Sequence, residues 1–131
     1  MKNKIISPYF KNGIFVGVRV TIGNEDFVIM SKNYNNGLRM TGKDAIKSLK
    51  EDGLSTWNFR QICFVMAYYK EINAILVNNG GDSLNDVFWT CSKYSPDEIY
   101  IYIGQMNMID CDIYLNQSPK FKVRIIKNLK K

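Results

Sequence analysis

The chain has 131 residues, of which 46% are hydrophobic and 23% are charged. This composition is typical of one globular domain and excludes a disordered chain, and the length suffices to bury a core without metals or crosslinks. No segment approaches the ~18 consecutive apolar residues that a membrane-spanning helix needs. We therefore predict a single folded domain, residues 1–131, without a membrane span.

The net charge of +6 comes from the end of the chain. The rest of the chain carries equal numbers of basic and acidic residues. The excess therefore predicts a local basic docking site for an acidic partner, with nucleic acid as the rival partner. Its residues are Lys120, Lys122, Arg124, Lys127, Lys130 and Lys131.

Residue types that commonly carry catalysis are scarce. The chain has no histidine, which removes the commonest general base and metal ligand. Cys63, Cys91 and Cys111 are odd in number and widely spaced, which favours small buried hydrophobic residues over disulfides or a zinc site. We therefore expect no enzymatic activity, no cofactor and no metal.

The amino-terminal stretch also bears on localisation. Its apolar residues are interrupted by Pro8, Lys11 and Asn12, so it lacks the continuous core of a signal peptide. We expect the chain to fold in the cytoplasm, with incorporation into a virion left open.

The first half of the chain predicts a strand pair followed by helices. Residues 14–22 and 27–31 are rich in β-branched residues, which is typical of strands. Residues 42–52 have apolar residues at helical spacing and end before Gly53. From Thr56, which we expect to cap the first turn, apolar residues recur at helical spacing from Phe59 to Leu76, with a break that could fall near Tyr69.

The second half predicts antiparallel strands at residues 86–92, 98–104, 108–115 and 120–126. In residues 98–104 isoleucines alternate with Tyr100 and Tyr102, which places the two tyrosines on one face. Phe88 and Trp89 are adjacent, so one ring should face the core, while the other packs beneath a covering loop or contacts a ligand. This order of strands, helices and strands predicts an α+β fold.

Several short pieces occur together in a characteristic order. They are Trp57, EINAIL at 71–76, Gly80 and Gly81, Leu84, FWTCSKYS at 88–95 and KVRII at 122–126. With the opening GIFVGVRV and FVIMS, they resemble the bacterial Lcl carboxy-terminal-type domains, a family with the C-type-lectin-like fold. The resemblance implies two helices with antiparallel sheets and adjacent amino- and carboxy-terminal strands. Lys2, Lys4 and Lys11 would then join the terminal lysines at one basic pole.

The sequence departs from the family pattern at two places. WNFRQ replaces the usual Trp-x-Leu-Pro turn, and Cys91 stands where a serine is usual. The calcium-and-sugar motifs of animal C-type lectins are absent as well. We therefore expect no calcium-dependent sugar site.

The late strands and loops hold polar and aromatic residues suited to contact surfaces, because tyrosine gives area with little loss of rotamer freedom. The alternative is an ordinary solvated sheet face. Asp110 and Asp112 share a strand face about 7 Å apart, which could hold a cation but is more typical of a solvated face. The candidate ligand-binding residues are Tyr94, Tyr100, Tyr102, Asn107, Asp110, Asp112, Tyr114 and Asn116.

These observations favour a non-enzymatic recognition or assembly module that binds a protein or a glycan. Such a module would suit a component of a bacteriophage virion or a bacterial surface adhesin, as part of an assembly or as a homo-oligomer. The alternative is a nucleic-acid-binding or structural accessory protein that uses the basic carboxy-terminal tail.

Overall fold

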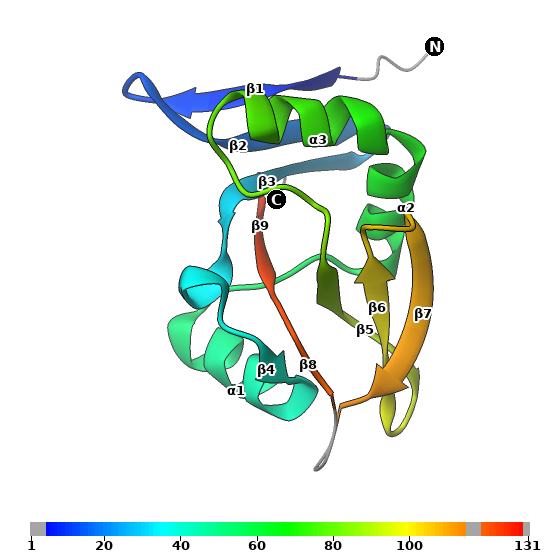
Figure 1. Cartoon of the computed structure of the whole chain (residues 1–131). Coiled ribbons are helices and arrows are strands. Elements are labelled where there is room, and N and C mark those ends of the chain that lie inside the picture. The colour runs from blue at the N-terminus through cyan, green and yellow to red at the C-terminus, as the bar shows by residue number, and fades with distance from the viewer. Residues whose placement is uncertain (1–4, 115–118, 130–131) are drawn as a thin grey trace.

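The computed structural model describes residues 5–114 and 119–129, and its largest sheet has four strands in the order β1-β2-β3-β9 (Figure 1). All neighbouring strands in this sheet are antiparallel. The strands are β1 (Ile5–Lys11), β2 (Ile14–Ile22), β3 (Glu25–Asn33) and β9 (Arg124–Asn128). The sheet thus combines the beginning of the chain with its end.

Strand β1 is absent from the sequence prediction because Pro8 interrupts its apolar residues. In the structure Pro8 pairs with Val18 at the edge of the sheet, where a residue without an N–H is tolerated. Asn12 and Gly13 connect β1 to β2 with positive φ angles of 53° and 78°. This Asn-Gly turn matches the twist of the two strands, so the hairpin is locally encoded.

The helical region agrees with the prediction in extent but differs at one cap. Helix α1 (Gly42–Asp52) spans the predicted residues, and the second segment breaks at Tyr68 into α2 (Phe59–Ala67) and α3 (Tyr69–Asn78). The predicted cap is wrong, because Asn58 and Gln61 form the capping box of α2. Thr56 instead bridges to Ile125, and its hydroxyl donates to the carbonyl of Arg124 at 2.6 Å.

The late strands form a separate antiparallel sheet in the order β5-β6-β7. Its members are β5 (Val87–Ser95), β6 (Glu98–Ile103) and β7 (Met108–Ile113). The last predicted strand is divided in two: β8 (Lys120–Phe121) pairs with β4 (Met40–Thr41), whereas β9 pairs with β3. Between them Lys122 exchanges backbone hydrogen bonds with β5, so the chain passes alongside that strand.

The structure confirms the α+β class but not the expected adjacency of the terminal strands. Strands β1 and β9 lie at opposite edges of the four-stranded sheet, with β2 and β3 between them (Figure 1). The last strand pairs with β3, which directly precedes the helical region. The basic pole that depended on this adjacency is therefore unsupported, and Lys2, Lys4, Lys130 and Lys131 lie outside the described residues.

The core consists of two hydrophobic clusters separated by β5. Phe88 lies in the first cluster with Trp57 and Tyr102, against α2, α3 and the four-stranded sheet. Trp89 lies in the second cluster, between β5–β6, α1 and the β4–β8 pair. Both rings are therefore structural, and Trp89 packs beneath a helix and a short strand pair rather than beneath a loop.

Within residues 5–114 and 119–129, no helix has the length and apolarity to span a membrane.

Candidate recognition surface

Two exposed aromatic rings and one half-buried ring, that of Tyr100, cluster on one face of the β5-β6-β7 sheet. The ring of Phe59 lies 4.7 Å from that of Tyr100, and the ring of Tyr94 lies 5.7 Å from Tyr100 on another side. Tyr94 is 60% exposed and Phe59 is 41% exposed. We call Phe59, Tyr94 and Tyr100 the aromatic patch.

The patch lies at the first residue of α2, where the helix does not cover the sheet. Tyr100 and Tyr102 point to the same face of β6. At Tyr102 this face is covered by α2, and Tyr102 lies in one buried cluster with α2 residues such as Ile62. Phe59 is the first residue of α2, and its backbone N–H donates to the hydroxyl of Ser92 on β5 at 2.8 Å. Helix and sheet thereby fix each other, so the rings stand on a rigid base.

A carboxylate lies at the edge of the aromatic patch. Glu98 accepts a hydrogen bond from Ser95 at 3.1 Å and one from the thiol of Cys111 at 3.7 Å. Partial burial and the negative charge of Glu98 raise the pKa of the Cys111 thiol, so this group stays protonated at neutral pH. Ile113, which pairs with Glu98 across the strands, is 48% exposed.

Tyr102 and Tyr114 do not belong to any exposed surface, contrary to prediction. Tyr102 is fully buried, its hydroxyl donates to Asn107 at 2.8 Å, and burial raises its pKa. The amide of Asn107 donates onward to the carbonyl of Met66 at 3.0 Å, so this residue ties the β6–β7 turn to α2. The hydroxyl of Tyr114 donates to the carbonyl of Pro96 at 2.7 Å. Through these bonds Tyr102, Asn107 and Tyr114 stabilise the fold. The prediction failed for the tyrosines because cross-strand alternation does not show which part of a sheet face is covered by other elements.

Asp110 and Asp112 lie on the opposite face of the sheet from the aromatic patch. They pair with Ile101 and Ile99, whereas Cys111 pairs with Tyr100. Each carboxylate accepts a hydrogen bond from the next backbone N–H, at 2.8 and 2.9 Å. No group of three or more Cys, His, Asp or Glu side chains within residues 5–114 and 119–129 is arranged to hold a metal ion. Asn116 lies outside the described residues.

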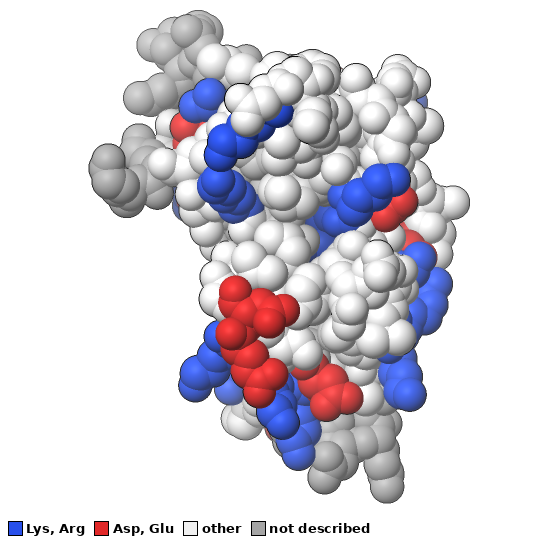
Figure 2. All heavy atoms as spheres, turned by 90° about the vertical axis from the view of Figure 1, so that its left-hand side faces the viewer, with Lys and Arg blue, Asp and Glu red and all other residues white. Residues whose placement is uncertain are grey.

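The basic residues of the tail are dispersed rather than gathered. Arg124 is fully buried, and the ammonium of Lys122 pairs with Asp86 at 2.9 Å. Lys120 and Lys127 are exposed but lie on different strands, β8 and β9. Figure 2 shows one face of the molecule on which blue and red groups are intermingled without a continuous basic field. Among the described residues of the tail, folding thus buries Arg124 and pairs Lys122, so their charges are not available to the predicted docking site.

The charge of Arg124 is used inside the protein. Its guanidinium donates to the side chain of Asn33 at 3.0 Å and to the carbonyl of Met30 at 3.1 Å. It also donates to the carbonyls of Asp82 and Ser83 at 2.9 and 3.2 Å, and it lies 5.6 Å from the ring centre of Phe88. The residue anchors β9 to β3 and to the loop before β5, and it has no surface available for a partner.

The cysteines also differ from the prediction. Cys63 and Cys91 are exposed and Cys111 is partly exposed, although all three were expected in the core. Phe59 shows the same error, because helical periodicity predicted that it is buried whereas its side chain is exposed. Its position at the first turn of α2, directly after the Asn58 cap, is the local signal that could have indicated exposure.

Comparison of the chain with protein-family models, with curated proteins and with solved structures gave no match.

Proposed function

We propose that this protein is a non-enzymatic recognition module that binds a glycan through the aromatic patch. The observation that carries the proposal is the pair of exposed rings, Phe59 and Tyr94, that both contact the half-buried ring of Tyr100 beside a carboxylate, on a rigid sheet and helix start. Large apolar groups grouped at the surface are uncommon unless they contact a partner.

The chemistry of the patch suits a sugar ring. The C–H faces of a pyranose are apolar and can lie against aromatic rings, whereas its hydroxyl groups need acceptors and donors at the edge. Tyr94 and Phe59 supply ring faces, and Glu98 keeps acceptor capacity beyond its bonds to Ser95 and Cys111. A protein partner would use the same rings, but a standard protein interface needs about 800 Å² on each side, more than three rings provide.

We also propose that the module has a C-type-lectin-like scaffold and works in an assembled particle or on a cell surface. The order of an amino-terminal sheet, helices and a late three-stranded sheet supports a C-type-lectin-like scaffold, whereas the separation of β1 from β9 is a departure from it. A module of this kind fits a bacteriophage virion component or a bacterial surface adhesin.

The test is a glycan array followed by titration of each hit with variants. Tyr94→Ser and Phe59→Ser should each weaken binding about tenfold or more, because each removes a stacking face, and Glu98→Gln should weaken it about three- to tenfold. Phe10→Ser is the matched control, since Phe10 is 51% exposed on β1 and lies outside the patch.

Two results would contradict the proposal. One is the absence of any hit on a broad array, which would leave a protein partner as the better explanation for the rings. The other is a hit whose affinity is unchanged in Tyr94→Ser and Phe59→Ser.

A further inference from the structure

A pocket of about 320 Å³ lies between α1 and the β5–β6 strands, on the opposite face of the sheet from the aromatic patch. We propose that it binds a small amphipathic anion, a carboxylate with an apolar chain. Pockets that hold small molecules measure about 300–1,000 Å³ and are mostly apolar, with few polar groups to orient the ligand. The inference does not depend on the proposed glycan binding.

The walls of the pocket are apolar and come from separate elements. Ile46 and Leu49 line it from α1, Leu54 from the segment after the helix, and Ile99 from β6. Ile46 and Leu54 are each 42% exposed, so apolar surface at the mouth is left in contact with water. An apolar chain in the pocket would remove that surface from water and thereby gain free energy.

The pocket continues toward the second hydrophobic cluster. A smaller cavity of about 30 Å³ shares Ile46, Leu49 and Ile99 with it and is also lined by Trp89. The polar groups along this path already have partners: the hydroxyl of Thr56 donates to the carbonyl of Arg124, and that of Thr90 donates to the carbonyl of Tyr100. The interior therefore offers the ligand apolar contact rather than hydrogen bonds.

The charge at the pocket has one sign. Among the residues that the structure describes, Lys50 and Lys93 are the only charged ones that line it, and none of the lining residues is acidic. Within residues 5–114 and 119–129, neither lysine forms an ion pair, and the ammonium of Lys93 lies 5.3 Å from the ring centre of Tyr114. Two such ammonium groups beside an apolar pocket complement an anionic head group on an apolar chain.

Cys91 also lines the pocket and gives a direct reporter of occupancy. In a Cys63→Ser/Cys111→Ser background, Cys91 is the remaining thiol, and its alkylation by iodoacetamide can be timed with and without octanoate. We expect saturating octanoate to slow alkylation about fivefold or more. Octan-1-ol and octyltrimethylammonium should protect at least about tenfold less effectively, because they lack the negative charge.

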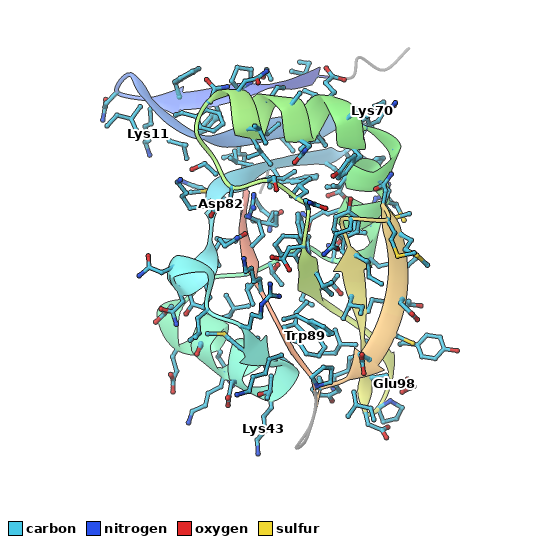
Figure 3. All side chains as sticks on the ribbon, in the orientation of Figure 1. Lys11, Lys43, Lys70, Asp82, Trp89 and Glu98 are labelled. Carbon is cyan, nitrogen blue, oxygen red and sulfur yellow. The ribbon has the colours of Figure 1, made fainter. Side chains whose placement is uncertain are left out.

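Charge reversal tests the role of the lysines. Lys50→Glu/Lys93→Glu should raise the half-protecting octanoate concentration about tenfold or more and make octyltrimethylammonium the better ligand. Lys11→Glu/Lys70→Glu changes the net charge equally at residues far from α1 and Trp89 (Figure 3), and should leave protection unchanged. For each variant the alkylation rate with octanoate is divided by the rate without it. This ratio corrects for any effect of the substitutions on the reactivity of the thiol.

Several outcomes would overturn the proposal. They are an unchanged alkylation rate with octanoate, equal protection by octan-1-ol, and an unchanged half-protecting concentration in the charge-reversed variant. Protection of Cys63 in a Cys91→Ser/Cys111→Ser variant would have the same meaning, because it would show unspecific binding. Titration of the Ile46 and Ile99 methyl resonances gives an independent check that the ligand lies in the pocket.

Discussion

The guanidinium of Arg124 holds three segments of the chain together inside the protein. Its partners are a side-chain amide and three backbone carbonyls, with no direct carboxylate among them. Burial lowers the pKa of Arg124 to about 10, so the group still carries its charge at neutral pH. The planar fork of an arginine can reach all four acceptors at once, which a lysine cannot do.

We predict that Arg124→Met destabilises the protein by about 3–5 kcal/mol, because it leaves buried carbonyl groups without donors. Urea denaturation at neutral pH measures this loss. Lys127→Met, at an exposed position on the same strand, should change the free energy of unfolding by about 0.5 kcal/mol or less. A loss below about 1 kcal/mol in Arg124→Met would show that water or neighbouring groups replace the guanidinium.

At the scale of elements, Asp86 connects the start of β5 to two other segments. Its carboxylate accepts two hydrogen bonds from Arg39, at 2.9 and 3.1 Å, and pairs with Lys122 at 2.9 Å. Arg39 directly precedes β4, and Lys122 lies between β8 and β9. Partial burial works to raise the pKa of Asp86, but the bonds from Lys122 and Arg39 outweigh it and hold the pKa below the ordinary value of 3.8.

This lowered pKa predicts a pH-dependent stability. A carboxylate with a depressed folded-state pKa stabilises the protein above the unfolded pKa, and that contribution is lost as pH falls through the folded value. Asp86→Asn should therefore lower the free energy of unfolding by about 1–2 kcal/mol at pH 7. The difference in free energy of unfolding between the variant and the native protein should become smaller below about pH 4, where the native carboxylate is protonated. Denaturation over this pH range measures the difference.

Asp110→Asn is the matched control for the Asp86→Asn substitution at neutral pH. Asp110 is exposed, and its carboxylate accepts a hydrogen bond from the N–H of Cys111. We expect Asp110→Asn to change the free energy of unfolding at neutral pH by only a small amount. A pH-independent loss in Asp86→Asn would mean that the ion pairs with Arg39 and Lys122 contribute little.

At the scale of the whole molecule, β5 lies between two hydrophobic clusters and contributes a large ring to each. Phe88 packs 5.5 Å from the ring of Trp57 in one cluster. Trp89 packs 5.0 Å from the ring of Phe121 in the other, and its indole N–H donates to the carbonyl of Met40 at 2.8 Å. Because a single strand serves both clusters, neither can be lost without disturbing the other.

We predict that Phe88→Ala and Trp89→Ala each destabilise the protein by about 3–5 kcal/mol and that unfolding remains a single cooperative transition. Fluorescence of the remaining tryptophans and far-ultraviolet circular dichroism should report the same midpoint. Phe10→Ala, at an exposed ring, should cost about 1 kcal/mol or less. Two separate transitions in either variant would show that the clusters fold independently.

The sequence by itself determined the features that depend on near neighbours in the chain. Helix α1, the break at Tyr68, and strands β6 and β7 follow from apolar periodicity, glycine positions and strand alternation. The α+β class follows from the order of these elements. Tyr94 is exposed and Tyr100 is half-buried, and their role in binding stays a prediction.

Tertiary structure alone decided which faces are covered and by what. Alternation put Tyr100 and Tyr102 on one face, but only the position of α2 buries Tyr102 fully and leaves Tyr100 half-buried beside Phe59. Composition marked Arg124 as part of a basic tail, but its bonds to residues more than forty positions away place it inside. Pairing of the last strand with β3 likewise joins segments far apart in sequence. Burial and strand order depend on such distant contacts, and local sequence patterns carry no information about them.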